Sequence, residues 1–290
     1  MMDNPNTATP SGRAEEAAVS SGSDLARRVL SALVMAPLAI GTAYLGGLIF
    51  AVLWGLAAIG VFWEWASLVA GAGKRPILLG GEAALTIASA LAAIGRSPEA
   101  VGVTLLTAIA IAVMAPTRHP GWTAVGVPYA GAIVIAAIAL RSDVENGWIA
   151  LMFLFAVVWT TDIAAYFVGR LVGGAKLLPR VSPKKTWSGA LGGLAAAVLA
   201  AIAVAAAAGL PRLFPIAVIA AGLSSLAQAG DLFESLLKRK FGAKDSSRLI
   251  PGHGGLMDRL DGFVAAATAA ALIGVVRGGI AAPAHGLLIW

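Results

Sequence analysis

The chain has 290 residues, of which 59% are hydrophobic and only 12% are charged, and its mean hydropathy is +0.85. Soluble domains are about 45–50% apolar and about 25% charged, so this composition excludes an ordinary soluble protein and is typical of a membrane protein. The net charge of +6 does not come with a polar domain that carries a basic patch, which argues against nucleic acid as a partner.

The first segment, residues 1–24, mixes Ser, Thr, Pro, Asn, Glu and Gly without periodicity, and we interpret it as a disordered cytoplasmic tail. Arg27 and Arg28 then precede an apolar stretch that starts at Val29 and is too long for a cleaved signal peptide. We expect this stretch to be a membrane anchor.

Apolar segments follow one another along the rest of the chain, and roughly nine of them reach the ~20 residues that a spanning helix needs. They predict an all-α, polytopic membrane fold. We divide it into N-terminal transmembrane helices at 25–147 and a C-terminal transmembrane catalytic region at 148–290. The predicted spans fall at about 29–46, 48–70, 77–95, 100–116, 123–140, 148–170, 187–209, 212–232 and 262–280.

The basic residues test this arrangement, because Lys and Arg gather in the cytoplasmic loops of membrane proteins. If the tail is cytoplasmic, all but four of the 21 Lys and Arg residues lie on the cytoplasmic side, the exceptions being Arg96, Arg141, Arg212 and Arg277. Two polar loops on that side, 170–187 and 233–261, are the expected place for chemistry. This predicts a multi-pass protein of the cell (inner) membrane with a cytoplasmic active site.

The loop at 170–187 contains Ser182-Pro183-Lys184-Lys185-Thr186-Trp187. We predict a capping Ser182 and Pro183 at the first helical position of the seventh span, so that free N–H groups and two lysines form an anion site. The alternative is that Lys184 and Lys185 only anchor the loop at the membrane surface.

The second loop and its flanks, from Gly230 to Gly262, read GDLFESLLKRKFGAKDSSRLIPGHGGLMDRLDG. Asp231, Glu234, Ser235 and Lys238 have the spacing of one helix face, and Asp258 and Asp261 are three residues apart at the start of the last span. Because the chain has no cysteine, a metal here would be held by oxygen or imidazole groups. Two carboxylate pairs at two helix ends predict a Mg²⁺ site.

Between the carboxylate pairs, the turn at 251–255 has small residues that would let a phosphate approach backbone N–H groups. Positive charge around it comes from Lys238, Arg239, Lys244 and Arg259. Carboxylates for a metal, a glycine turn and basic side chains favour phosphoryl or nucleotidyl transfer, which depends mostly on positioning and charge neutralisation. For any single residue the alternative is a solvated ion pair, but the whole set argues against it.

Three further acids fall inside the predicted spans, where ionisable groups are costly and often functional. Asp162 lies eight residues before Arg170, about 12 Å from the cytoplasmic helix end, so it could face the same cavity as Asp231 or make a structural hydrogen bond. No role is assigned to Glu64 or Glu82.

The stretch from Ser235 to Asp261 fits S-x-L-K-R-x4-K-D-x-S-x2-I-P-x-H-G-G-L-x-D-R-L-D and resembles the motif of phosphatidate cytidylyltransferases. The stretch at 182–187 is similar to a second sequence motif of that family, S-P-K-K-T-W-E-G, although Ser188 stands where the family usually has Glu. The resemblance implies transfer of the cytidylyl group of CTP to phosphatidic acid, giving CDP-diacylglycerol and pyrophosphate in phospholipid biosynthesis.

The resemblance also implies roles for individual residues. Asp231, Asp258 and Asp261 would be ligands of Mg²⁺ or groups beside it, with Glu234 and Asp162 as further candidates, and the acids are numerous enough for a second cation. Catalytic positive charge is expected from Lys184, Lys185, Lys238, Arg239 and Lys244. The residues expected to bind CTP are Ser182, Lys184, Lys185, Lys238, Arg239, His253, Gly254, Gly255 and Arg259. A homodimer is compatible with the sequence.

Three other functions compete with this interpretation. A CTP-dependent polyprenol or phytol kinase shares related C-terminal motifs and would transfer the γ-phosphoryl group instead. A CDP-alcohol phosphatidyltransferase needs further acids after its D-x-x-D-G motif, and no acid follows Asp261. A transporter would tend to show internal repeats and broken helices near the membrane midplane, which the sequence does not display.

Overall fold

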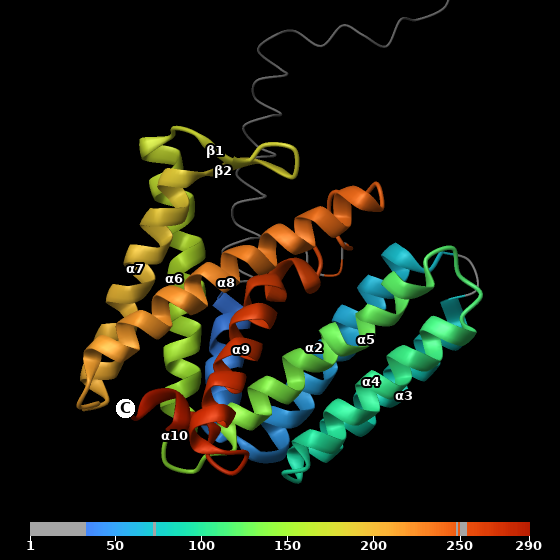
Figure 1. The fold of residues 1–290 in the computed structure, drawn as a ribbon, viewed down its shortest axis with the longest axis horizontal. Coiled ribbons are helices and arrows are strands. Elements are labelled where there is room, and N and C mark those ends of the chain that lie inside the picture. The colour runs from blue at the N-terminus through green and yellow to red at the C-terminus, as the bar shows by residue number, and fades with distance from the viewer. Residues whose placement is uncertain (1–32, 72–73, 248, 250–253) are drawn as a thin grey trace, which may run out of the picture.

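The computed structural model of the protein describes residues 33–71, 74–247, 249 and 254–290, so the tail predicted at 1–24 lies outside it. The described chain is almost entirely helical, which confirms the all-α prediction (Figure 1). Its long helices are α2 (Gly47–Val69), α3 (Lys74–Ala93), α4 (Ser97–Met114), α5 (Pro120–Arg141), α6 (Gly147–Val172), α7 (Trp187–Ala207), α8 (Leu213–Lys240) and α9 (Met257–Gly278). A short α10 (Pro283–Leu288) follows.

Eight helices of the described chain are long and apolar enough to cross a membrane. The first predicted span corresponds to a shorter described helix, Leu33–Leu45. It is separated from α2 by Gly46. Both Gly46 and Gly47, the first residue of α2, are at positive φ, a backbone conformation that glycine adopts at little cost. The count of about nine spans stays a prediction.

The interior of the bundle is built around α5, which packs against α2, α3, α4 and α9. Its most apolar window is 78% buried, whereas the corresponding window of α4 is only 17% buried. Large apolar side chains such as Leu79, Val113 and Leu199 are exposed on the outside. In water so much exposed apolar surface would be unfavourable, so these outer faces are suited to lipid.

Small residues bring the C-terminal helices into close contact. A Cβ atom added at Gly230 of α8 would lie 2.5 Å from the carbonyl oxygen of Asp261 on α9, and one at Gly193 of α7 would lie 2.7 Å from that of Thr161 on α6. Backbones that approach this closely are typical of packed membrane helices. The crossing of α8 and α9 places Asp231 and Asp261 side by side.

The loop between α6 and α7 is a two-stranded antiparallel hairpin, β1 (Lys176–Leu178) and β2 (Ser182–Thr186). The predicted helix start at Ser182 and Pro183 is therefore wrong. The N-cap of α7 is Thr186, whose Oγ1 accepts a hydrogen bond from Gly189 N at 3.1 Å. A β-branched residue suits the end of a strand, and threonine is a common N-cap, so Thr186 serves both and the helix begins four residues later than expected.

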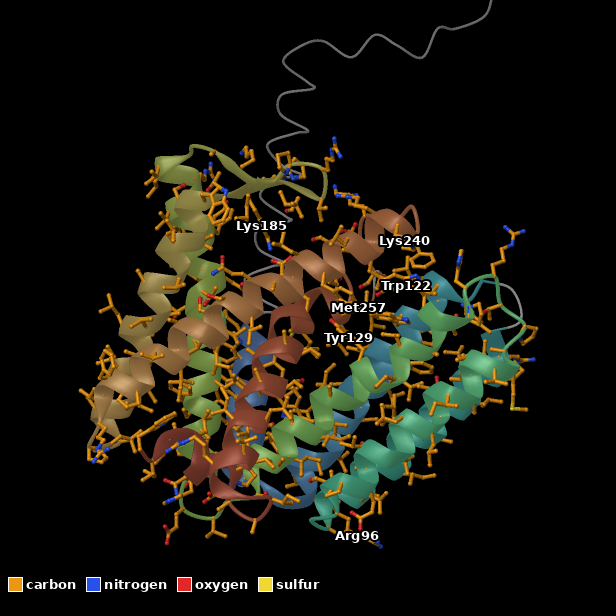
Figure 2. The ribbon with its side chains drawn as sticks, in the orientation of Figure 1. Arg96, Trp122, Tyr129, Lys185, Lys240 and Met257 are labelled. Carbon is orange, nitrogen blue, oxygen red and sulfur yellow. The ribbon has the colours of Figure 1, made fainter. Side chains whose placement is uncertain are left out.

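The two helices around the second polar loop are longer than their predicted spans. α8 continues to Lys240, and α9 already begins at Met257. The acids and Lys238 that were predicted to share a helix face therefore lie on one continuous helix. Figure 2 shows Lys185 and Lys240 at one end of the bundle and Arg96 at the opposite end, as the distribution of basic residues predicts.

Candidate active site

A cavity of about 700 Å³ lies among α6, the hairpin, α7, α8 and the start of α9. Its walls combine apolar and small residues of the membrane helices with many charged side chains. The charged ones are Asp162, Arg170, Lys176, Lys184, Lys185, Asp231, Glu234, Lys238, Asp245, Asp258, Arg259 and Asp261. A cavity with this mixture of charges suits a polyanionic substrate together with a cation.

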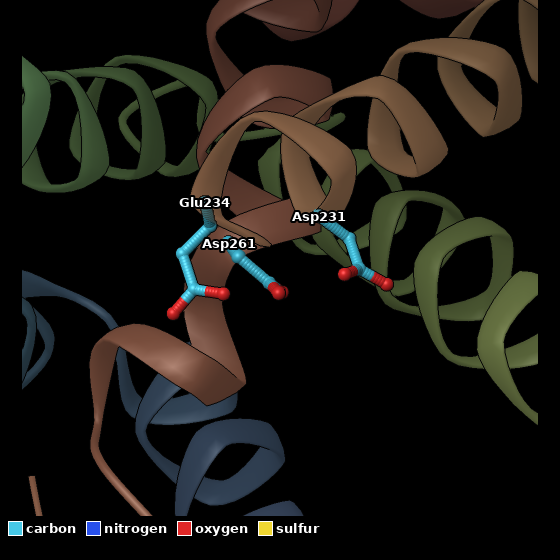
Figure 3. A group of neighbouring side chains, drawn as sticks. All are labelled: Asp231, Glu234 and Asp261. Carbon is cyan, nitrogen blue, oxygen red and sulfur yellow. The ribbon is translucent and has the colours of Figure 1, made fainter. Parts of the chain in front are cut away.

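Three of the acids form a compact cluster, which Figure 3 shows. Asp231 and Glu234 come from α8, and Asp261 comes from α9. One carboxylate oxygen from each residue lies within 4.8 Å of the other two. Two oxygens bound to one Mg²⁺ at about 2.1 Å each are at most about 4.2 Å apart. The spacing therefore fits a single divalent cation after small side-chain rotations.

Glu234 has an incomplete set of partners. Its side chain is 1% exposed, and its Oε2 forms an ion pair with Lys238 Nζ at 2.6 Å. Its Oε1 is buried and has no hydrogen-bond partner among the described residues. A buried carboxylate oxygen without a partner is costly, so this atom fits a site that is completed by a cation.

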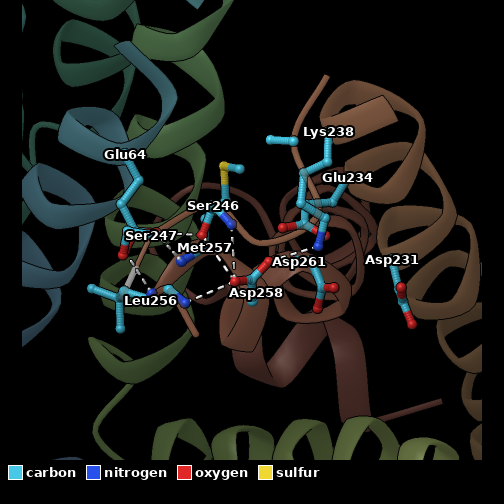
Figure 4. A network of polar contacts seen from close by, with 12 residues as sticks. Glu64, Asp231, Glu234, Lys238, Ser246, Ser247, Leu256, Met257, Asp258 and Asp261 are labelled. Carbon is cyan, nitrogen blue, oxygen red and sulfur yellow. Dashed lines mark hydrogen bonds and ion pairs between the residues drawn. The ribbon is translucent and has the colours of Figure 1, made fainter. Parts of the chain in front are cut away.

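Asp258 lies close to the cluster but has a different environment, shown in Figure 4. Its Oδ1 accepts from Lys238 Nζ at 2.6 Å, and its Oδ2 accepts from Gly255 N at 2.7 Å and from Ser246 N at 3.2 Å. The hydroxyl of Ser246 also lies 3.0 Å from the same oxygen. Both carboxylate oxygens are therefore already hydrogen-bonded by the protein.

The basic side chains reach the cavity from two directions. Lys185 of β2 forms an ion pair with Asp231 of α8, and Lys184 and Arg259 line the cavity without an ion pair to the described residues. Sequence reasoning missed Arg170 and Lys176, which also line it. Both lie in the loop predicted to carry chemistry, but nothing local indicates that they point into the cavity.

The remaining predicted residues are distributed differently. Asp162 lines the same cavity as Asp231, whereas Ser182, Arg239, Lys244, Gly254 and Gly255 lie outside its lining. The N–H of Gly255 is donated to Asp258 and is not open to a phosphate. His253 lies outside the described residues.

Glu64 is the acid that the sequence analysis left without a role. It is fully buried in α2, yet its carboxylate accepts hydrogen bonds from the loop before α9 and from the first N–H groups of α9. The available signal was an acid in the middle of an apolar segment, which is costly unless its charge is compensated.

Comparison with known proteins agrees with this chemistry. A model of the cytidylyltransferase family matches residues 26–276. The phosphatidate cytidylyltransferase of Brucella suis is 42% identical over 255 residues, which cover 88% of this chain and 94% of that protein. The phosphatidate cytidylyltransferases of Haemophilus influenzae and Bacillus subtilis are 40% and 38% identical over 48% and 50% of this chain, and over 51% and 54% of their own lengths.

Proposed function

The chain belongs to the cytidylyltransferase family, and from this premise we propose how its residues carry out the reaction. It is a multi-pass membrane enzyme that transfers the cytidylyl group of CTP to phosphatidic acid, giving CDP-diacylglycerol and pyrophosphate. The lipid kinase and the transporter are not supported by its relatives. The observation that carries the assignment of residues is the cavity in which α8, α9 and the hairpin bring acids and lysines together.

Asp231, Glu234 and Asp261 are the proposed ligands of Mg²⁺. The support is their mutual spacing and the unpartnered Oε1 of Glu234. When bound, Mg²⁺ supplies positive charge that neutralises the triphosphate. Asp162 lines the same cavity and is the candidate for a second cation, whereas Asp258 supports the cluster by holding Lys238 and the loop before α9.

Lys184, Lys185 and Arg259 are proposed to bind the triphosphate of CTP. All three line the cavity and come from the hairpin and from the first turn of α9. A triphosphate that enters competes with Asp231 for Lys185, so this ion pair would open as the substrate binds. Oriented positive charges of this kind are the main contribution that a protein makes to phosphoryl and nucleotidyl transfer.

The reaction needs no nucleophile from the protein. An oxygen of the phosphatidate phosphate attacks the α-phosphorus of CTP, and the bond from that phosphorus to the oxygen shared with the β-phosphate breaks, releasing pyrophosphate. Because the lipid phosphate is already an anion, no strong general base is required. The side chains of the cavity hold the two polyanions in line and neutralise their repulsion.

The orientation in the membrane is part of the proposal. The excess of Lys and Arg at the end of the bundle that carries the cavity supports a cytoplasmic active site in the cell (inner) membrane. Tyr166 and Ala190, from two membrane helices, also line the cavity. This supports lateral entry of phosphatidic acid from the lipid and entry of CTP from the cytosol. A homodimer stays a prediction.

The test follows the label of CTP into the lipid. Purified enzyme in detergent is given Mg²⁺, phosphatidic acid and CTP that is labelled in either the α- or the γ-phosphate. We expect α-label in the lipid fraction and γ-label in pyrophosphate. Lipid that carries γ-label but no α-label, above all with a polyprenol as acceptor, would contradict the proposal and indicate a kinase.

A further inference from the structure

Glu64 is a fully buried carboxylate that the proposed mechanism does not use. It lies on α2, in the N-terminal half of the chain, whereas the cavity is formed by α6 to α9. Burying an isolated charge costs far more than burying a neutral polar group. Its presence therefore needs an explanation in its contacts.

Both oxygens of Glu64 are engaged by the segment that leads into α9 (Figure 4). Oε1 accepts from Ser247 Oγ at 2.5 Å and from Leu256 N at 2.8 Å. Oε2 accepts from Met257 N at 2.7 Å and lies 3.0 Å from Ser246 Oγ. One carboxylate thus holds the loop that connects α8 and α9 at two places, at Ser246 and Ser247 within the loop and at its last residue, Leu256.

The charge of Glu64, a residue of α2, is compensated because its carboxylate lies beside the first residues of another helix, α9. The first N–H groups of a helix have no partner within the helix, and the helix dipole favours a negative charge there. Leu256 is the N-cap residue of α9, and Met257 is its first helical residue. Hydrogen bonds from N–H groups to a carboxylate are about twice as strong as those between neutral groups.

A continuous path of contacts joins Glu64 to the acidic cluster. Ser246 Oγ lies 3.0 Å from both Glu64 and Asp258, and because a hydroxyl has one proton it donates to only one of them at a time. Asp258 binds Lys238, and Lys238 in turn binds Glu234, each at 2.6 Å. Glu64 also fixes the first residue of the helix that carries Asp258 and Asp261.

We propose that Glu64 is a positioning residue for the cytidylyl transfer: it fixes the start of α9 so that Asp261 faces Asp231 and Glu234, and Asp258 faces Lys238. This inference rests on the proposed function. It assigns to α2 a part in the reaction, although no residue of α2 lines the cavity.

The experiment compares Glu64→Gln with Glu82→Gln. Glu82 is an acid of the neighbouring α3, its side chain has no hydrogen-bond partner among the described residues, and it is absent from the lining of the cavity. In Glu64→Gln an amide NH₂ replaces one oxygen, so a donor faces the N–H of either Leu256 or Met257. Loss of a group that orients metal ligands typically costs about 10–100-fold in metal affinity or activity.

The readouts are chosen to separate positioning from general stability. Hydrogen exchange of peptides that span 254–262, the melting temperature, and the kcat and Mg²⁺ requirement per folded molecule are measured for each variant. We expect Glu64→Gln to exchange faster at the start of α9, to need more Mg²⁺ and to lose about 10–100-fold in kcat. Glu82→Gln should match the wild type in all of these.

Two results would overturn the inference. One is unchanged exchange at 254–262 in Glu64→Gln; the other is a lowered melting temperature with wild-type kcat and Mg²⁺ requirement per folded molecule, which indicates a stabilising role only. If Glu64→Gln does not fold, Ser247→Ala removes a single donor to the same carboxylate and is measured in the same way. If the wild type itself transfers no α-label, the proposed function fails, while the exchange experiment still tests the anchoring of α9.

Discussion

The acids around the start of α9 differ in how the protein satisfies them. Asp258 is hydrogen-bonded through both oxygens, whereas Glu234 keeps one buried oxygen without a partner among the described residues. Asp231 and Asp261 complete the cluster with Glu234. A carboxylate whose oxygens already accept hydrogen bonds from the protein is a poor metal ligand. The hydrogen-bond partners therefore give different roles to carboxylates that are chemically alike.

The first prediction concerns this cluster. Asp261→Asn and Glu234→Gln should each lower kcat/KM by about 10²-fold or more, because they weaken the proposed Mg²⁺ site and leave triphosphate charge unneutralised. Steady-state assays of purified protein check this. Glu99→Gln is the control, since Glu99 is exposed and pairs with Arg96 at the far end of the bundle. Asp261→Asn with more than about a tenth of the activity would remove it as a ligand.

A second prediction concerns the lysines of the hairpin. Lys185→Met should raise the KM for CTP by about tenfold or more, because one positive charge near a phosphate is lost from a partly desolvated site. Lys240→Met serves as the control. Lys240 lies at the same end of the bundle, but its ammonium group packs on the ring of Trp122, 5.2 Å from the centroid. Equal KM values for CTP in both variants would mean that Lys185 does not bind the nucleotide.

Among the elements, the pair α6 and α7 determines where the hairpin lies. Gly189 and Gly193 let α7 lie against the backbone of α6, and Ala197 continues the same buried stripe. The hairpin connects the ends of these two helices, so their separation determines the position of Lys184 and Lys185 above α8. The small side chains are therefore required by packing.

Enlarging this stripe should separate the two helices. We expect Gly193→Val to destabilise the protein by about 1–3 kcal/mol, the usual cost of overpacking, and to lower activity by displacing the hairpin. Thermal unfolding in detergent measures the first effect. Gly222→Ala on α8 is the matched control, because a Cβ there meets no atom within 4 Å. A wild-type melting temperature for Gly193→Val would contradict this prediction, because it would show that α6 and α7 accommodate the larger side chain without loss of stability.

At the level of the whole molecule, the helices form an apolar bundle with its charged cavity at one end. Lys185 and Lys240 lie at that end, and Arg96 lies at the other (Figure 2). The outer faces of α3, α4 and α7 expose large apolar side chains. A bilayer accommodates this distribution if the cavity opens at the cytoplasmic surface.

Cysteine labelling tests this orientation, and the chain suits it because it contains no cysteine. We expect Lys244→Cys to react with an impermeant reagent only after the cytoplasmic side is opened, and Ser142→Cys to react from outside in intact cells. Both positions are exposed and lie in loops at opposite ends of the bundle. Labelling of Lys244→Cys from outside would invert the proposed placement of the active site.

The sequence by itself determined the class of protein, most of its helices and the family motif. These properties depend on composition, on runs of apolar residues and on spacings within one helix, such as Asp231 to Lys238, which are local. It also predicted that the two polar loops belong to one region, because Lys and Arg gather in both, and in the structure acids and lysines from both line one cavity.

Only the tertiary structure decided which partners each of these residues has. Glu64 and Leu256 are 192 positions apart, and no local pattern indicates that they form a hydrogen bond. The spacing of Asp258 and Asp261 is the same as that of Asp231 and Glu234, yet among these four acids the N–H groups of Ser246 and Gly255 donate only to Asp258. Partners of this kind are selected by helix packing, and packing depends on contacts between residues that are distant along the chain.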